Sequence, residues 1–217
     1  MKASEAVLSV MVAVATMLVI VGVSVIVFLN PVWVAFEQDR SGAAQLTGYP
    51  PDAVHAVTNG VLNDLVIGPP AFAQSVNGTP VFNDRERAHL EDVRSVFFAF
   101  SLLVLAGVVI LAVGRALARG APWYRHAVGY GAIALIVGVV IGGVISVVAF
   151  DQAFAVFHEL FFAGGTYTFD PATDRLVQLF PIQFWEETTL ALGVVIIALA
   201  GIFAWWGLRD RPAAATA

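Results

Sequence analysis

The sequence alternates between long apolar runs and polar segments. Residues 6–36, 95–114, 127–150 and 188–208 contain no Asp, Glu, Lys or Arg. Each run reaches the roughly 20 residues with which a helix crosses a bilayer core about 30 Å thick. The pattern predicts four transmembrane helices, at about residues 6–29, 94–116, 127–150 and 188–208.

Two polar segments, about residues 30–93 and 151–187, are too long to be simple connections. In the first, Asp52 is placed to cap an amphipathic helix over about residues 52–67. The turn sequence Asn77-Gly78 indicates a short hairpin. Asn83-Asp84 indicates the start of a polar helix, residues 85–94, that continues into the second span.

The second polar segment is rich in aromatic residues. Phenylalanines recur every three or four positions beside His158, so a helix here would present an aromatic stripe, at Phe150, Phe154, Phe157 and Phe161. Gly164-Gly165 ends that helix, and an amphipathic piece containing Leu176 and Leu179 follows. We expect the stripe to lie against lipid or to fold back into the mouth of the bundle.

The composition is that of a membrane protein, since 59% of the 217 residues are hydrophobic and 12% are charged, against about 25% charged in soluble domains. A water-soluble globule is excluded. The expected fold is all-α, an integral membrane four-helix transmembrane bundle with two extracytoplasmic segments carrying short amphipathic helices, in a single transmembrane domain of residues 1–217. Small residues spaced four apart predict close helix packing along the third span, at Ala134, Gly138, Gly142 and Ser146.

The distribution of charge predicts the orientation in the membrane. Six of the eleven basic residues lie near the termini or in the short hinge between the second and third spans, at Lys2, Arg115, Arg119, Arg125, Arg209 and Arg211. Fourteen of the sixteen acidic residues lie in the two long polar segments. The positive-inside rule then places both termini in the cytoplasm and both long segments outside. No basic stripe with stacking aromatic residues supports nucleic-acid binding.

Histidine is the side chain that titrates nearest neutral pH. His55 and His126 are interpreted as surface residues. His89 and His158 lie at the outer ends of the second and third spans. The short hinge makes these spans antiparallel neighbours, which brings the two ends together, and the sequence leaves open whether the two side chains touch. Asp92, one turn after His89, is placed to fix its tautomer or raise its pKa.

The pattern around these two histidines leaves more than one interpretation open. His89 either belongs to a functional site or to a solvated helix start anchored at the lipid headgroups. For His158 a functional interpretation is favoured, because a titratable group against apolar surface is costly unless it is used or paired. The alternative is an incidental polar residue on an aromatic surface helix.

Several familiar catalytic motifs are absent from the sequence. The chain has no Cys, which excludes cysteine nucleophiles and thiolate metal sites. The run His158-Glu159 begins like a zinc-protease helix, but Phe162 occupies the position of the second histidine. There is no G-x-S-x-G elbow. No metal or cofactor is expected.

Two motifs stand in these polar segments, and together they resemble a known family. Residues 82–94 read FNDRERAHLEDVR, and residues 157–162 read FHELFF, followed by Phe169-Asp170-Pro171, Asp174-Arg175-Leu176 and Phe180-Pro181. They are similar to the two motifs of the four-span lipoprotein intramolecular transacylases (Lit). Arg94 stands where that family has Lys, and Tyr167 where it more often has Trp.

The resemblance implies a plasma-membrane acyltransferase. Such enzymes move the sn-2 acyl chain of a diacylglyceryl lipoprotein to the α-amino group of its N-terminal cysteine, which gives the lyso form. The catalytic residues that the resemblance implies are His89 and His158. Our hypothesis is that His158 is the general base and that His89, oriented by Asp92, protonates or stabilises the tetrahedral oxygen, or that the two roles are exchanged.

The resemblance also implies supporting residues and partners. The supporting residues are Asp92, Arg85, Arg87, Arg94, Tyr167 and Asp170. The arginines would supply positive charge to the oxyanion or to lipid headgroups. The partners are the diacylglyceryl-modified lipoprotein N-terminus and membrane phospholipid.

Two alternatives to an enzyme follow from the same features. One is a b-type haem protein with His89 and His158 as axial ligands. The other is a non-catalytic four-span module whose outer segments bind a partner.

Overall fold

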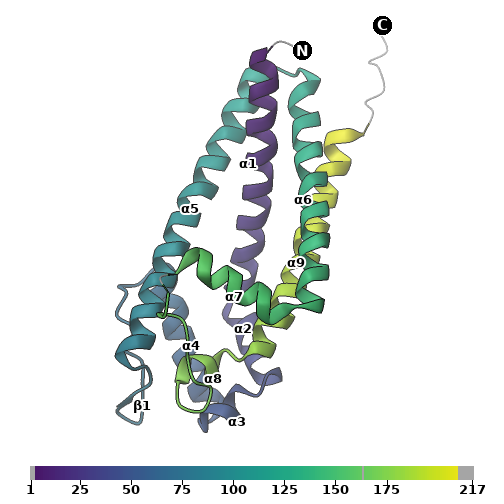
Figure 1. The fold of residues 1–217 in the computed structure, drawn as a ribbon. Helices are drawn as coiled ribbons and strands as arrows, with labels where there is room; N and C mark the ends of the chain where they lie inside the picture. The colour runs from purple at the N-terminus through teal and green to yellow at the C-terminus, as the bar shows by residue number, and fades with distance from the viewer. Residues whose placement is uncertain (1–2, 163, 210–217) are drawn as a thin grey trace, which may run out of the picture. The chain divides into compact units, whose positions relative to one another are not determined.

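Helices account for most of the structure, a computed structural model that describes residues 3–162 and 164–209 (Figure 1). The helices are α1 (Ala3–Phe28), α2 (Pro31–Arg40), α3 (Ala43–Thr47), α4 (Pro51–Val66), α5 (Asp84–Ala118), α6 (Pro122–Val148), α7 (Phe150–Phe161), α8 (Arg175–Leu179) and α9 (Ile182–Leu208). Two short strands, β1 (Ser75–Val76) and β2 (Thr79–Pro80), precede α5.

Helices α1, α5, α6 and α9 are long and apolar enough to cross a membrane, by length and composition. This confirms the four predicted spans and the all-α membrane fold. Helix α5 begins at Asp84 and runs unbroken to Ala118, so the predicted polar extension of the second span is also confirmed. Within α5, the stretch from Ser95 to Gly114 is free of charged side chains, and Arg115 follows it in the last turn.

Some predicted element ends are wrong. The third apolar run does not continue to residue 150 as one helix, because the chain turns at Ala149 (φ −148°) and α7 starts at Phe150. Helix α4 begins at Pro51 with Pro50 as its cap, and no side chain caps it, so Asp52 lies in the first turn. Proline suits the first helical turn because that turn leaves its N–H groups unpaired.

The described chain forms two compact units, neither continuous in sequence. Unit 1 comprises residues 1–24, 102–142 and 193–217, and unit 2 comprises residues 25–101 and 143–192. Unit 1 holds parts of the four long helices. Unit 2 holds the short helices, the hairpin and the remaining parts of α1, α5, α6 and α9.

Unit 1 is packed through glycines. A Cβ at Gly131 of α6 would lie 2.5 Å from the carbonyl oxygen of Ala13 in α1, and one at Gly207 of α9 would lie 2.7 Å from the backbone of Gly129 in α6. Only glycine permits such approach of two backbones, a common device in membrane helix packing. These contacts join α6 to α1 and to α9 (Figure 1).

The glycines that were expected to pack closely along the third span make no close contact with another helix. A Cβ at Gly138 or Gly142 would meet no atom within 4 Å. The expectation of close packing at these positions is therefore wrong. The close contacts are made nearer the start of α6, at Gly129 and Gly131.

Unit 2 has its own hydrophobic core. Its buried members come from α3, α4, the hairpin region, α5 and α8, and are Ala43, Val54, Val57, Val61, Phe72, Val81, Phe82, Leu90, Leu176 and Leu179. Strands β1 and β2 pair antiparallel around Asn77 and Gly78, whose positive φ angles of 52° and 79° form the predicted tight turn. The predicted hairpin is confirmed, and the core fixes α8 against the start of α5.

Candidate active site

A capping box fixes the start of α5 in unit 2. The side-chain oxygen of Asn83 accepts a hydrogen bond from the backbone N–H of Glu86 at 3.0 Å, and the Glu86 carboxylate accepts one from the N–H of Asn83 at 2.8 Å. Reciprocal bonds of this kind satisfy N–H groups that a helix start leaves unpaired. Glu86 is 1% exposed and its other oxygen accepts the N–H of Leu176 at 2.7 Å. The start of α5 is thus tied to α8.

Asp174, just before α8, joins the same elements. Its buried carboxylate accepts hydrogen bonds from Asn83 Nδ2 at 3.1 Å, from the Arg85 guanidinium at 2.7 Å and from the N–H of Asp170 at 2.7 Å. A carboxylate with several donors is a strong anchor, since charge-assisted bonds are about twice as strong as neutral ones. It holds the loop of residues 170–174 against the first turn of α5.

His89 lies in the second turn of α5 and is 6% exposed. Its ring centroid lies 4.8 Å from that of Phe162 and 5.4 Å from that of Phe169. Nδ1 is buried without a hydrogen-bond partner among the residues that the structure describes. An unpaired buried nitrogen costs free energy, and this nitrogen keeps its full capacity for a hydrogen bond.

His158 lies near the end of α7 and is half-buried among aromatic rings. Phe154 and Tyr167 lie with centroids 4.2 Å and 5.2 Å from its imidazole. Its Nδ1 lies 2.7 Å from the backbone carbonyl oxygen of Phe154. A carbonyl can only accept, so Nδ1 carries a hydrogen and donates it. In the neutral imidazole the lone pair is then on Nε2.

The two histidines, whose contact the sequence left open, lie side by side. Their ring centroids are 6.1 Å apart and the ring planes are inclined by 23°. Phe162 contacts both rings, at 4.8 Å and 5.4 Å. The pair therefore joins an imidazole whose Nε2 can accept a proton to a second imidazole whose buried Nδ1 has no partner among the described residues, and aromatic rings surround both.

The three predicted arginines are not equivalent. Arg85 pairs with Asp174, and its guanidinium carbon lies 5.0 Å above the Phe169 ring that contacts His89. Arg87 pairs with Asp84 and also donates to the carbonyl of Phe82. Arg94 donates to the backbone carbonyl of Asp64 at the end of α4. The contacts link only Arg85 to the histidine pair.

Asp92, Asp170 and Tyr167, the other predicted supporting residues, differ in their contacts. Asp92 is exposed and makes no hydrogen bond to Nδ1 of His89, so packing against aromatic rings holds the imidazole instead. Asp170 accepts the N–H of Ala172 and donates its own N–H to Asp174, which shapes the loop before α8. Tyr167 contacts the rings of both His158 and Phe162.

Sequence reasoning missed Glu86, Asp174 and the two rings of Phe162 and Phe169 as site residues. A signal for Glu86 was present, because Asn83 and Glu86 have the spacing of a capping box. Asp174 lies within the second motif, but its partners on α5 are 89 and 91 residues away in sequence. Such pairs cannot be read from local spacing.

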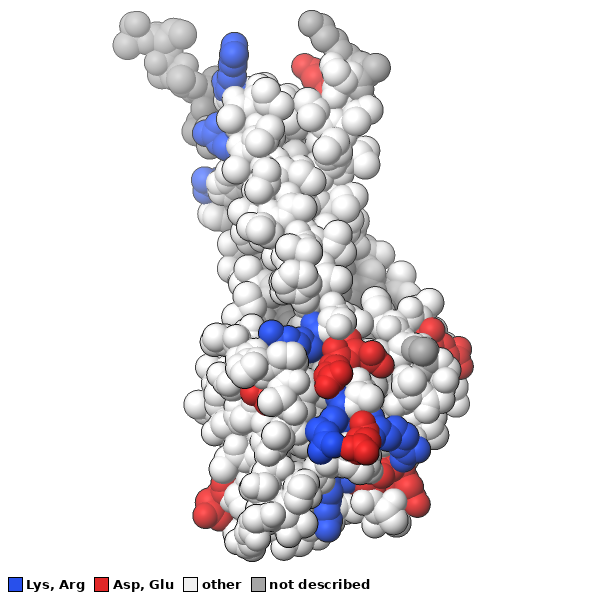
Figure 2. All heavy atoms as spheres, turned by 90° about the vertical axis from the view of Figure 1, so that its left-hand side faces the viewer, with Lys and Arg blue, Asp and Glu red and all other residues white. Residues whose placement is uncertain are grey.

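The distribution of charge differs between the units. In unit 1 the charged side chains of the described residues are Glu5, Arg115, Arg119, Arg125 and Arg209, all at the ends of helices. In unit 2 both signs gather in mixed groups, visible on the face in Figure 2. Arg85, Arg87, Asp84 and Asp174 form one such group through their ion pairs. The histidine pair thus adjoins a mixed, polar surface.

Comparisons with known proteins identify the fold and the family. The chain shares its fold with the membrane-integral lipoprotein intramolecular transacylase Lit from Bacillus cereus, with a TM-score of 0.78, 18% identity and 94% of each chain covered. A structure of that enzyme with one histidine replaced by arginine matches with a TM-score of 0.73 and 17% identity, over 92% of this chain and 88% of that one.

Sequence comparison gives two further matches. An uncharacterised protein of Aquifex aeolicus is 27% identical over 141 residues, which are 64% of this chain and 62% of the relative. The match thus spans less than two thirds of that relative. The family model described as "Lipoprotein intramolecular transacylase Lit" matches residues 10–185, a range that includes both motifs and both histidines. The resemblance seen in the motifs is confirmed, and this multi-pass membrane protein belongs to the Lit family.

Proposed function

We propose that the chain is a lipoprotein intramolecular transacylase. Its substrate is a lipoprotein whose N-terminal cysteine carries a diacylglyceryl group. The α-amino nitrogen attacks the sn-2 ester carbonyl of the same molecule, so that an amide C–N bond forms and the ester C–O bond breaks. The amine proton ends on the released sn-2 oxygen, and the product is the N-acyl, S-monoacylglyceryl form. No enzyme nucleophile is needed, in keeping with a chain that lacks cysteine.

His158 is the general base in this proposal. An α-amine has an ordinary pKa of about 7.7–8.0 and must give up a proton on the way to the amide. The hydrogen bond from His158 Nδ1 to the Phe154 carbonyl leaves Nε2 as the acceptor. The same nitrogen then returns the proton to the departing sn-2 oxygen. This fixed tautomer is the observation that carries the assignment.

His89 stabilises the tetrahedral oxygen. Its buried Nδ1 has no partner in the described chain, and a preorganised donor in a dry site is worth more than one in water. Arg85, held by Asp174 over the Phe169 ring, supplies positive charge beside the site. Because the amine and ester belong to one molecule, holding them in near-attack geometry provides much of the rate gain.

The aromatic segment accommodates the acyl chains. Phe157 and Phe161 of α7 lie on its exposed face, at 48% and 51% exposure, with ring centroids 4.9 Å apart. Exposed phenylalanines on one face of a short amphipathic helix are suited to contact with lipid. An acyl chain would reach the histidines from the lipid phase along this face, and membrane phospholipid surrounds the same side chains.

The site faces the extracytoplasmic leaflet of the plasma membrane in this proposal, and both termini are cytoplasmic. The support is the positive charge at the α5–α6 hinge, where Arg115, Arg119 and Arg125 lie close together in sequence. Family membership favours this enzyme over the haem and partner-binding alternatives.

The test uses the purified protein in micelles with a synthetic peptide whose N-terminal cysteine carries a diacylglyceryl group. N-acylation is followed by fragmentation mass spectrometry. His158→Gln should lose roughly 10²–10⁴-fold in rate, as expected for removal of a general base, and His89→Gln should also be strongly impaired.

Two other histidines provide matched controls. His55 is paired with Asp39 and His126 is exposed, and neither lies in the aromatic site. His55→Gln and His126→Gln should keep the wild-type rate. Full activity of His158→Gln, or equal losses in all four variants, would rule out the proposed roles.

A further inference from the structure

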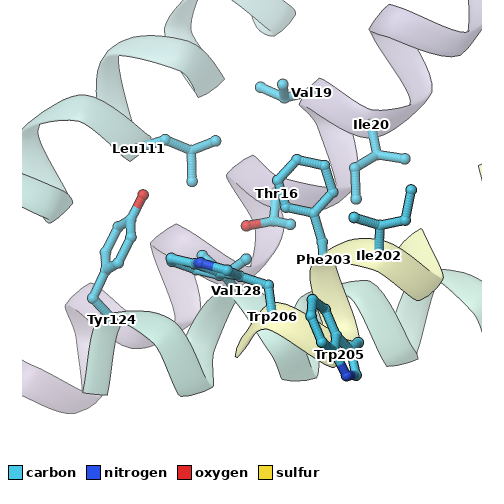
Figure 3. Close-up of a pocket in the computed structure, with 10 residues that line it drawn as sticks. All are labelled: Thr16, Val19, Ile20, Leu111, Tyr124, Val128, Ile202, Phe203, Trp205 and Trp206. Carbon is cyan, nitrogen blue, oxygen red and sulfur yellow. The ribbon is translucent and has the colours of Figure 1, made fainter. Parts of the chain in front are cut away.

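A second candidate site is built wholly from residues of unit 1. A cavity of about 330 Å³ is lined by residues of all four long helices: Thr16, Val19, Ile20, Leu111, Tyr124, Val128, Ile202, Phe203, Trp205 and Trp206 (Figure 3). Its volume is in the range of small-molecule sites, about 300–1,000 Å³. The lining is almost wholly apolar, and the Thr16 hydroxyl is already bonded to the Val12 carbonyl. The cavity therefore suits a hydrocarbon chain.

The cavity adjoins the surface of the helices that the bilayer covers. Ile202 and Trp205, both on α9, are 61% and 64% exposed and also line the cavity. Ile20 and Val128 lie at its buried side, at 2% and 4% exposure. A chain can thus enter laterally from the lipid phase.

A smaller, cationic cavity adjoins the apolar one. It has a volume of about 50 Å³ and is lined by Arg115, Ala118, Gly120, Ala121, Tyr124, Arg125 and Trp206. Tyr124 and Trp206 line both cavities. A water needs about 10–15 Å³ of such space, so the smaller cavity admits a compact group of several atoms. An apolar cavity and a cavity lined by two arginines therefore lie next to each other, with Tyr124 and Trp206 at their common boundary.

Arg125 has an N–H group that is free to donate a hydrogen bond to an anion. Its terminal nitrogen donates to the carbonyl of Arg209 at 2.6 Å and to that of Gly207 at 3.4 Å, which caps the end of α9. Its Nε is buried without a partner among the described residues. Arg115 of α5 lines the same cavity and is exposed. The cavity also contains Gly120 and Ala121, directly before the N-terminus of α6, where the helix dipole favours negative charge.

From these features we infer that unit 1 binds an anionic glycerophospholipid, with an acyl chain in the apolar cavity and the phosphate between Arg115 and Arg125. Basic pockets between membrane helices are suited to such headgroups. The site is distinct from the proposed transacylase site and independent of that reaction. The lipid would lie in the leaflet at the α5–α6 hinge and bridge α5, α6 and α9.

Lipid binding is measured by native mass spectrometry of the full chain. Phosphatidylglycerol or phosphatidylcholine is added to the protein in micelles, and the protein is then released from the micelles in the spectrometer. Wild type should retain phosphatidylglycerol in preference to phosphatidylcholine and should melt at a higher temperature with it. Glycerol 3-phosphate, which has the phosphate but no chain, should neither raise the melting temperature nor compete. Equal retention of both lipids, or full competition by glycerol 3-phosphate, would overturn the inference.

Matched variants separate a built site from general charge attraction. Arg115→Gln should weaken phosphatidylglycerol binding by roughly tenfold, and Arg125→Gln should do the same if it folds. Arg119→Gln removes the same charge from the same hinge, but Arg119 does not line the cavity, so its binding should match wild type. An equal loss for Arg119→Gln and Arg115→Gln would mean non-specific attraction and would overturn the site.

A further variant tests the apolar chamber. Ile202→Trp places a larger side chain at an exposed lining position, where misfolding is not expected because the side chain is already 61% exposed. It should reduce retention of phosphatidylglycerol while the headgroup arginines remain. Unchanged retention would show that the chain lies outside this cavity.

Discussion

At the scale of single residues, the proposed chemistry depends on which nitrogen of each imidazole is already hydrogen-bonded within the protein. His158 uses Nδ1 to hold the Phe154 carbonyl, whereas His89 has a buried Nδ1 with no partner in the described chain. Neither fact follows from sequence spacing. Asp92 lies one helical turn after His89, and from that spacing we expected its carboxylate to orient the imidazole. Its side chain is exposed to solvent, and the rings packed against His89 hold the imidazole instead.

Asp174→Asn should damage both stability and activity. The carboxylate accepts hydrogen bonds from Asn83, Arg85 and the Asp170 N–H. The NH₂ group of an asparagine side chain would face one of these donor groups, and neither could then accept the other's hydrogen. A buried donor left unpaired costs about 1–3 kcal/mol. Thermal unfolding and the peptide assay measure the two effects. Asp52→Asn, exposed in α4 and without a capping bond, is the control and should behave as wild type.

Glu37 gives a prediction for pH. Burial, and then the neighbouring Glu187 carboxylate, raise the pKa of the Glu37 carboxyl above its ordinary value of 4.5, and Arg40 opposes this only in part. A raised pKa means that the folded state holds the proton more tightly than the unfolded chain. Its favourable contribution is therefore present below pH 4.5 and is lost as the pH rises through the raised pKa.

Glu37→Gln removes that titration. The variant should gain stability relative to wild type as the pH is raised from about 4.5 towards neutrality, measured as the difference in unfolding temperature in micelles. A difference that stays constant over this range would contradict the raised pKa.

At the scale of elements, local signals were sufficient where one stretch of chain sets the structure. The four spans, the continuation of α5 from its polar start, the turn at Asn77-Gly78 and the amphipathic α4 were all predictable from composition and periodicity. Helices α2 and α3 were not predicted. Their buried polar residues, such as Gln38, bond to α4 and to the end of α8, so their stability comes from contacts that are remote in sequence.

Helix packing in unit 1 gives a matched pair of glycine variants. Gly131→Ala would place a methyl group 2.5 Å from the Ala13 carbonyl oxygen, and overpacking of this kind costs about 1–3 kcal/mol. Gly138→Ala meets open space on the same helix and should be neutral or slightly stabilising, because alanine favours helix more than glycine. Thermal unfolding in micelles checks both, and equal effects would show that α1 and α6 do not approach at Gly131.

At the scale of the whole molecule, the family comparison confirms the Lit membership that the two motifs indicated. The contact between the two histidines adds how residues of the two motifs come together. Two residues 69 positions apart in sequence lie with rings 6.1 Å apart. The antiparallel arrangement of the second and third spans was enough to predict that these two span ends come together, but not that the two rings touch. The aromatic wall formed by Phe162 and Phe169 was beyond prediction, because it depends on how the loop after α7 folds back.

The proposed orientation in the membrane can be tested by cysteine labelling, because the chain has no native cysteine. Asp52→Cys in the exposed first turn of α4 should react with a membrane-impermeant maleimide in intact cells. Arg119→Cys in the α5–α6 hinge should react only after the membrane is opened, because the positive-inside rule places that hinge in the cytoplasm. The opposite pattern of labelling would reverse the topology.

The most direct test of the central claim is the position of the acyl chains on lipoproteins in cells. The transfer is an isomerisation, so the mass of the N-terminal lipopeptide does not change and fragmentation must locate the chains. In cells that contain the chain, the spectra should show an acyl group on the cysteine nitrogen and one on the glyceryl. Cells that lack the chain, or carry His158→Gln, should show both chains on the glyceryl and a free amine. The same acyl positions in all three would contradict the transacylase account.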